Sequence, residues 1–223
     1  MRSKLPFAAL CAASVLWLTS TTAVFADAGA SRPRAGFAGQ AASADARYAA
    51  DFIASHADNQ NMPYVIVDKK SARVFVFAAD GQLRGATTVL LGLGIGDQSV
   101  PGIAQRAPSS LKPLERTTPA GRFVSEPGHN LHGEEIVWID YEAKIAIHRL
   151  RPDSSRERRA ERMASASLDD KRISLGCVVV PVDFYEGVLQ PVLGRRYGVV
   201  YVLPENSPVE NMFGPFKLSL SQP

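Results

Sequence analysis

Short runs of β-branched and aromatic residues, separated by turn-forming residues, are the dominant pattern of the chain. Residues 64–68 and 73–77 are two such runs, joined by a polar turn. Ala79-Asp80-Gly81 has the Asp-Gly composition of a tight hairpin turn, and residues 84–91 resume the strand pattern. These segments predict three strands in meander order.

The same pattern returns in the second half of the chain, where it is mixed with helical segments. Further strands are expected at 121–125, 135–141, 144–148, 177–180 and 197–203. Helices are expected at 45–56, 154–165 and 181–193, and a polar surface loop at 97–119. The predicted fold class is mostly β with a minor α+β character: a compact β-sandwich or other β-rich domain with one or two packed helices.

The N-terminal residues have the order of a secretory signal peptide. Arg2 and Lys4 precede a 12-residue apolar run, and Val24-Phe25-Ala26 puts small residues where a signal peptidase reads. A retained membrane anchor is the alternative, but a spanning helix needs about 20 apolar residues. We therefore expect a periplasmic or otherwise exported protein that meets the membrane only through a cleaved signal peptide.

Domain organisation follows from the composition beyond that cleavage site. The expected parts are a signal peptide at 1–26, a flexible Ala/Gly/Ser-rich linker at 27–46, a helical lead-in at 47–63, a β-rich domain at 64–205 and a C-terminal tail at 206–223. Removing Arg2 and Lys4 lowers the formal charge from +3 to about +1. A net charge so near zero gives no reason to expect a nucleic-acid partner. We also expect the protein to be a monomer.

The chain has two cysteines, and only Cys177 would remain after cleavage, because Cys11 lies in the apolar run. A single cysteine in an exported protein cannot form a disulfide within its own chain, so it is either packed or kept for chemistry. His148 ends one predicted strand and Cys177 opens another. A neighbouring imidazole lowers a thiol pKa and carries its proton, so we predict Cys177 as nucleophile and His148 as base. The alternative is a core cysteine beside an unrelated histidine.

Gly176 adds a second chemical feature. A residue without a side chain lets the backbone approach a substrate carbonyl closely. The backbone amides of Gly176 and Cys177 are therefore the predicted donors to an oxyanion.

Two other motifs are interpreted as structural. Gly92-Leu93-Gly94-Ile95-Gly96 lacks the lysine and hydroxyl of a phosphate loop and is expected to be a flexible turn. His129 and His132 lack the third ligand of a metal site and are expected in a solvated loop, where one of them could line a cleft. We expect neither a metal nor a cofactor.

Taken together, these residues resemble the L,D-transpeptidase (YkuD) family of bacterial peptidoglycan enzymes. Residues 64–92 resemble its opening β-meander, and Thr117-Thr118-Pro119-Ala120-Gly121-Arg122-Phe123 resembles its Thr-Pro-x-Gly-x-Phe segment. Ile145-Ala146-Ile147-His148 and Ser174-Leu175-Gly176-Cys177-Val178 resemble its catalytic histidine strand and Ser-His-Gly-Cys signature. The resemblance spans roughly Tyr64 to Leu203.

The resemblance implies acyl transfer on peptidoglycan stem peptides. Cys177 would attack the third residue of a tetrapeptide stem, the terminal D-alanine would leave, and His148, oriented by the Arg149 carbonyl, would act as base and then as acid. A side-chain amine of a second stem would resolve the thioester, forming a cross-link or attaching a partner to the wall. Resolution by water would make the protein an L,D-carboxypeptidase or stem-peptide hydrolase. A packed Cys177 would leave a non-catalytic wall-associated domain.

Two departures and one insertion separate the chain from the family. Leu175 replaces the signature histidine, and Val179 replaces the polar residue two positions after the cysteine. The other candidate cleft residues are Ser174, Arg149 and His132. Residues 151–172 form an arginine-rich insertion, which is either a solvated helix or a basic lid facing carboxylates of stem peptides or anionic wall polymers.

Overall fold

The computed structural model of the chain describes residues 36–151 and 156–213. The predicted signal peptide 1–26 and the first part of the predicted linker lie outside these residues. Within the described ranges, every helix is too short or too polar to cross a membrane.

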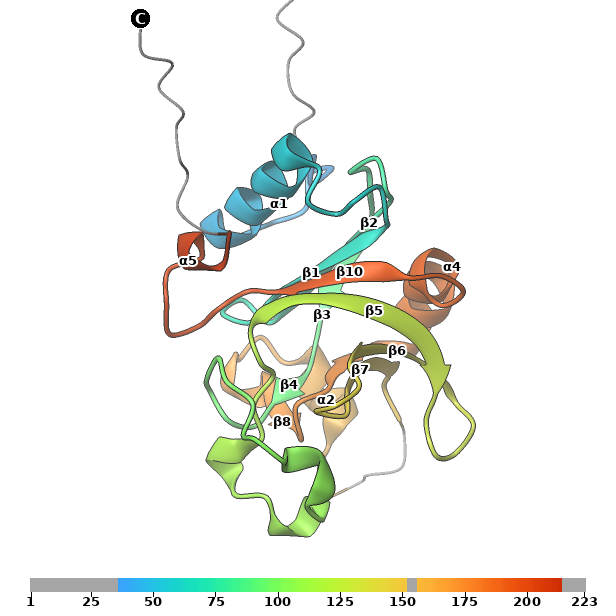
Figure 1. Ribbon diagram of the computed structural model, residues 1–223. Helices are drawn as coiled ribbons and strands as arrows, with labels where there is room; N and C mark the ends of the chain where they lie inside the picture. The colour runs from blue at the N-terminus through green and yellow to red at the C-terminus, as the bar shows by residue number, and fades with distance from the viewer. Residues whose placement is uncertain (1–35, 152–155, 214–223) are drawn as a thin grey trace, which may run out of the picture. The chain divides into compact units, whose positions relative to one another are not determined.

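A sheet of eight strands, ordered β3-β2-β1-β10-β5-β6-β7-β9, is the main element of the domain (Figure 1). Its strands are β1 (Tyr64–Asp68), β2 (Arg73–Phe77), β3 (Leu83–Thr88), β5 (Gly121–His129), β6 (Glu135–Asp140), β7 (Ile145–Arg149), β9 (Val178–Val180) and β10 (Gly198–Val202). The short strands β4 (Leu91–Gly92) and β8 (Arg172–Ser174) form a second, two-stranded sheet. The pairs β1–β10, β7–β9 and β4–β8 are parallel.

The two edges of the large sheet come together at Leu90. This residue lies between β3 and β4, and it exchanges backbone hydrogen bonds with Val179 of β9, at 2.9 and 2.8 Å. Since β3 and β9 are the two edge strands, this contact brings the sheet close to a closed barrel. The mostly β fold with few helices, predicted from the sequence, is confirmed.

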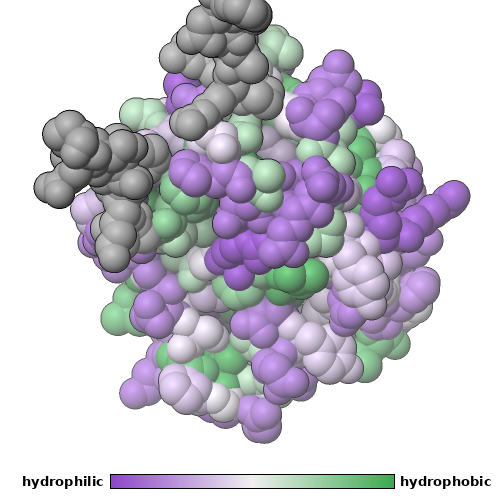
Figure 2. All heavy atoms as spheres, turned by 45° about the horizontal axis from the view of Figure 1, so that its top comes forward, coloured by the Kyte–Doolittle hydropathy of each residue, from purple (hydrophilic) through white to green (hydrophobic). Residues whose placement is uncertain are grey.

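Strand alternation supplies a separate core on each face of the sheet. The first core contains Val65, Val67, Val74 and Val76, and it is covered by a helical segment made of α3 (Val182–Phe184), the π-helix η5 (Tyr185–Leu189) and α4 (Gln190–Leu193). The second core contains Tyr64, Ile66, Phe75 and Phe77, and it is covered by α1 (Ala44–His56). All five residues of β1 are buried, because the strand has a packed layer on both sides. On the face that carries α1, hydrophilic side chains alternate with small apolar patches (Figure 2).

Phe37 overturns part of the linker prediction. It lies within 27–46, yet its ring is buried with its centroid 5.0 Å from that of Phe75 and 5.6 Å from that of Phe77. Together with Ala42 and Ala46, it packs into the second core, so the described part of this segment belongs to the domain. The described end of the predicted tail is also packed: Val209 is buried in the second core, and α5 (Glu210–Phe213) follows it.

Several predicted boundaries shift in the structure. The strand expected at 121–125 continues to His129, and the strand expected at 84–91 is divided into β3 and β4. The loop 97–119 contains three 3-10 turns: η1 (Ile103–Gln105), η2 (Pro108–Ser110) and η3 (Pro113–Glu115). The charged helix expected at 154–165 is described as α2 (Arg159–Ala164), followed by the 3-10 turn η4 (Asp169–Lys171).

Candidate active site

β7 and β9 bring His148 and Cys177 to one face of the sheet. Ile147 and Val178 are paired in the parallel ladder and both belong to the first core, so the residues on either side of them face the other way. Cys177 immediately precedes Val178, and His148 immediately follows Ile147 and pairs with Val179. The two candidate side chains therefore share a face of adjacent strands. They are offset by two residues, or about 7 Å along the strand.

The imidazole of His148 has a defined orientation. Its Nδ1 lies 2.8 Å from the carbonyl oxygen of Arg149. A carbonyl oxygen only accepts hydrogen bonds, so Nδ1 carries the proton and donates it, and Nε2 is left as the basic nitrogen. The backbone partner implied by the family resemblance is thus present.

The Cys177 thiol lies against the start of β7. Its Sγ is 3.7 Å from the carbonyl oxygen of Lys144, and the backbone amide of Ala146 acts to lower the pKa of the thiol. Within the described part of the chain, no hydrogen bond joins the thiol to the His148 ring. Catalytic hydrogen bonds are often long in a free enzyme and shorten in the reacting complex.

Burial keeps both groups neutral at pH 7. It raises the pKa of the Cys177 thiol, against the opposing effects of the Ala146 amide and the positive charges of Arg151 and Arg159. Burial also lowers the pKa of His148, against the Arg149 carbonyl, and the same two arginines lower it further. The resting pair is a thiol and a neutral imidazole, so the proton has to move when the sulfur attacks.

The turn that carries Cys177 is closed by Ser174 and Thr118. The Gly176 amide donates to Ser174 Oγ at 3.1 Å, and Ser174 Oγ donates to the Cys177 carbonyl at 2.6 Å. Thr118 Oγ1 donates to the Gly176 carbonyl at 2.9 Å. The Gly176 amide, predicted as an oxyanion donor, is therefore engaged in the turn, and the Cys177 amide remains as the candidate donor.

Gly176 itself is required by space and by backbone conformation. Its φ is +134°, a value that residues with side chains rarely adopt. A Cβ atom here would lie 2.6 Å from Ile145 Cδ1 and 2.6 Å from the Thr117 carbonyl oxygen. The glycine lets the Thr117–Thr118 segment lie directly against the nucleophile turn.

The glycine-rich segment 92–96 has the same role and is not a flexible turn. A Cβ on Gly94 would lie 2.8 Å from the Leu114 carbonyl oxygen, and one on Gly92 would overlap the carbonyl of Arg116. The Gly92 amide donates to Thr118 Oγ1 at 2.9 Å. The flexible-turn prediction is wrong because these glycines allow two backbone segments to pack closely.

The three other candidate cleft residues lie in different places. Ser174 is buried within the nucleophile turn. The Arg149 side chain lies on the opposite face of β7 from His148, paired with Glu186 at 3.0 Å and with its guanidinium 4.7 Å from the centroid of the Tyr185 ring. His132 is exposed in the β5–β6 turn, where its backbone amide donates to Asn130 Oδ1. Of the three, the structure brings only Ser174 to the cysteine.

The two departures from the family signature differ in exposure. Val179 is fully buried in β9, between His148 on one side and Leu90 on the other. An apolar residue at this position therefore packs in the sheet. Leu175 is 39% exposed and adjoins the nucleophile turn.

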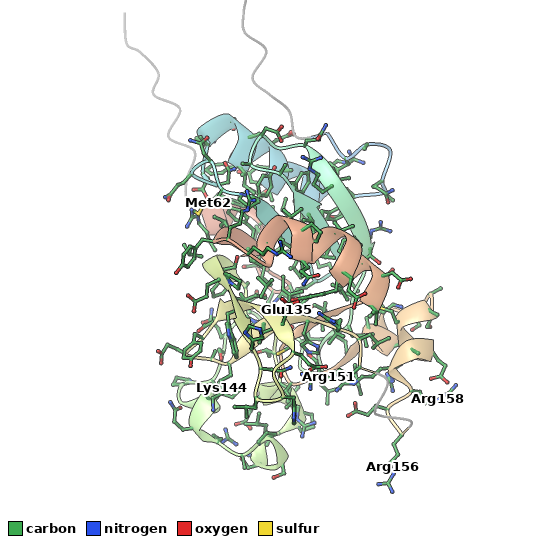
Figure 3. All side chains as sticks on the ribbon, turned by 90° about the vertical axis from the view of Figure 1, so that its right-hand side faces the viewer. Met62, Glu135, Lys144, Arg151, Arg156 and Arg158 are labelled. Atoms are coloured by element: carbon green, nitrogen blue, oxygen red, sulfur yellow. The ribbon has the colours of Figure 1, made fainter. Side chains whose placement is uncertain are left out.

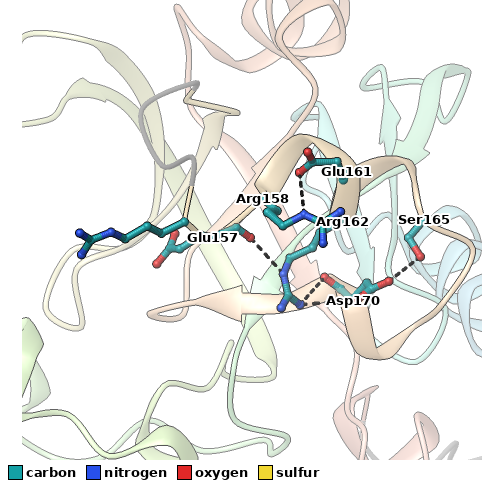
Figure 4. Close-up of a pocket in the computed structure, with 7 residues that line it drawn as sticks. Glu157, Arg158, Glu161, Arg162, Ser165 and Asp170 are labelled. Carbon is teal, nitrogen blue, oxygen red and sulfur yellow. Dashed lines mark hydrogen bonds and ion pairs between the residues drawn. The ribbon is translucent and has the colours of Figure 1, made fainter.

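The arginine-rich insertion carries paired charges. Arg151 lies 2.7 Å from Glu134, and Arg159 lies 2.5 Å from Glu157. Arg156 and Arg158 point away from the sheet (Figure 3). A surface hollow of about 340 Å³ on this segment (Figure 4) is lined by Arg156, Glu157, Arg158, Glu161, Arg162, Ser165 and Asp170. Arginines and carboxylates are equal in number there, so the hollow favours neither sign of charge.

Lys171 anchors the insertion. It is buried, and its Nζ donates to the carbonyls of Arg162, Met163 and Ser165 at 2.7, 2.8 and 2.5 Å. These carbonyls belong to the C-terminal end of α2 and the residue after it, where a positive charge is favourable. The helix is thereby fixed beside β8, which leads into the nucleophile turn.

A buried ionic cluster, unnoticed in the sequence, supports the same region. The Lys69 side chain is fully buried, and its Nζ lies 2.9 Å from Asp97 Oδ1 and 3.4 Å from Glu205 Oε2. It also donates to the Thr118 carbonyl at 2.9 Å, and Arg172 pairs with Glu205. A lysine between two strand patterns gives no sequence signal of burial. In the described residues, no group of three His, Cys, Asp or Glu is arranged to hold a metal ion.

No protein-family model matches the chain, and no curated protein matches it. Several solved structures are similar to it, including the following three. The first is the helical cell shape determining protein Pgp2 of Campylobacter jejuni, with 17% identity and a TM-score of 0.44 over 66% of this chain and 49% of that one. The second is an L,D-transpeptidase of Enterococcus faecium in a cysteine-to-serine form, with 19% identity and a TM-score of 0.36 over 64% and 50%. The third is an L,D-transpeptidase of Mycobacterium smegmatis, with 14% identity and a TM-score of 0.35 over 63% and 58%. The chain thus spans about half the length of these proteins.

Proposed function

We propose that the protein is an exported L,D-transpeptidase that acts on peptidoglycan stem tetrapeptides through a Cys177 thioester. The supporting observation is the shared face of β7 and β9, which carries a thiol and an imidazole whose Nδ1 is engaged by the Arg149 carbonyl. That engagement leaves Nε2 as the base. The sequence resemblance supplies the substrate class.

The proposed reaction starts from the neutral pair. His148 Nε2 takes the thiol proton as Cys177 Sγ attacks the carbonyl of the third stem residue, and the resulting oxyanion faces the Cys177 amide. The carbon–nitrogen bond to the terminal D-alanine then breaks, and the imidazolium returns its proton to the leaving amine. An amine of a second stem attacks the thioester, His148 removes the proton from that amine, and the thiol is regenerated.

Incubation of the protein, without residues 1–26, with purified tetrapeptide muropeptides tests this proposal. New dimers indicate transfer, whereas tripeptide monomers alone indicate hydrolysis, which is the second proposed activity. Cys177→Ala is the matched variant, because it removes only the sulfur. Processing that persists in Cys177→Ala would refute both activities, and no processing by the unaltered protein would favour a non-catalytic wall-associated domain.

A further inference from the structure

Thr118 connects three segments that meet behind the nucleophile turn. It is fully buried, and its hydroxyl accepts a hydrogen bond from the Gly92 amide while donating one to the Gly176 carbonyl, both at 2.9 Å. Its own carbonyl accepts from Lys69 Nζ. Both the side chain and the backbone of Thr118 are therefore held in place.

The Gly176 carbonyl and the Cys177 amide belong to one planar peptide unit. In a trans peptide these two groups point in opposite directions, and the described residues contain no cis peptide bond. A hydrogen bond that fixes the carbonyl on one side therefore fixes the direction of the amide on the other. Because Gly176 has no side chain, its own backbone torsions restrain this peptide plane less than those of another residue would.

The other polar backbone groups of the turn are already paired. The Gly176 amide and the Cys177 carbonyl are both bound by Ser174 Oγ. Among the described residues, none accepts a hydrogen bond from the Cys177 amide. This amide is thus the backbone donor that the turn leaves available.

We propose that Thr118 is a positioning residue that aims the Cys177 amide at the oxyanion formed during acylation. This inference rests on the proposed function, since it requires acyl transfer at Cys177. Thr118 acts through the peptide bond between Gly176 and Cys177 and does not touch the substrate.

The test compares two reactions of the same sulfur. Acylation by a carbapenem passes through a tetrahedral oxyanion, whereas alkylation by iodoacetamide displaces iodide and forms no oxyanion. Thr118→Val removes the hydroxyl at nearly constant volume, and Thr118→Ala removes it without adding an apolar atom. Thr118→Ser keeps the hydroxyl. Thr117→Val is the matched control, because the neighbouring Thr117 hydroxyl donates to Gln98 and not to the nucleophile turn.

We expect Thr118→Val and Thr118→Ala to slow acylation by about 10- to 100-fold, somewhat less than the full loss of an oxyanion donor. Alkylation should keep its wild-type rate, Thr118→Ser should restore acylation, and Thr117→Val should behave as wild type. Rates are measured below the unfolding midpoint of every variant. Unchanged acylation in Thr118→Val and Thr118→Ala, or an equal fall in both reactions, would overturn the inference. If the unaltered protein is alkylated but never acylated, the proposed function fails, and the role of Thr118 fails with it.

Discussion

Replacing Gly176 by alanine should damage both stability and acylation. The added Cβ would lie 2.6 Å from Ile145 Cδ1 and 2.6 Å from the Thr117 carbonyl oxygen, which is closer than van der Waals contact allows. The backbone φ of +134° is also unfavourable for alanine. The substitution therefore combines steric overlap with backbone strain.

The magnitude follows from these two contributions. A non-glycine residue at such a φ costs about 1–3 kcal/mol, and an extra carbon forced into a packed site costs about 1–3 kcal/mol. The free energy of unfolding should therefore fall by about 2–6 kcal/mol. For a domain of this size, the melting temperature should fall by ~4–24 °C, at about 2–4 °C per kcal/mol.

Gly187→Ala is the matched control. A Cβ at Gly187 meets nothing within 4 Å, and the residue lies in η5, so alanine should leave stability unchanged or raise it by about 0.5–1 kcal/mol. Thermal and urea unfolding give the stabilities, and carbapenem acylation gives the effect on the site. Equal stability of Gly176→Ala and the wild type would refute the reasoning about the turn.

Three further predictions concern charge. Lys69→Met should lower the unfolding free energy by about 3–5 kcal/mol in urea, because it removes a buried cation and leaves Asp97 without its partner and Glu205 with Arg172 alone. Lys70→Met, at an exposed ion pair, should cost less than about 1 kcal/mol. Burial lowers the pKa of His148, so the neutral, basic imidazole persists on acidification. The acylation rate should therefore be constant at neutral pH and fall only below about pH 6.5. A fall in rate that begins above pH 7 would contradict this prediction. Arg159 lowers the same pKa, so Arg159→Gln should move the acid limb of the rate profile to higher pH, whereas Arg158→Gln, at a side chain 72% exposed, should not.

The strong strand patterns could be predicted from the sequence. The runs 64–68 and 73–77 match β1 and β2 residue for residue, because both strands are nearly or completely buried and are therefore rich in apolar residues. β8 could not be predicted in this way. It has three residues, two of them polar, and its strand character comes from pairing with β4.

The candidate pair could be named from the sequence, but its geometry could not. The shared face of Cys177 and His148 depends on the parallel register between β7 and β9, which no local pattern specifies. The sequence identifies Thr118 only as part of the Thr-Pro-x-Gly segment. Its hydrogen bond to the Gly176 carbonyl could not be predicted, because Gly176 lies 58 residues away. The burial of Lys69 and Lys171 has no signal in the local sequence, because the partners that surround both side chains are brought to them only by the fold.

The most direct test of the account is the intact mass of the protein after exposure to a carbapenem. The account predicts one covalent adduct with the mass of the drug on the unaltered chain, and none on Cys177→Ala. A chain that acquires no adduct, or an adduct that persists after Cys177 is replaced, would contradict the claim that Cys177 is an activated nucleophile.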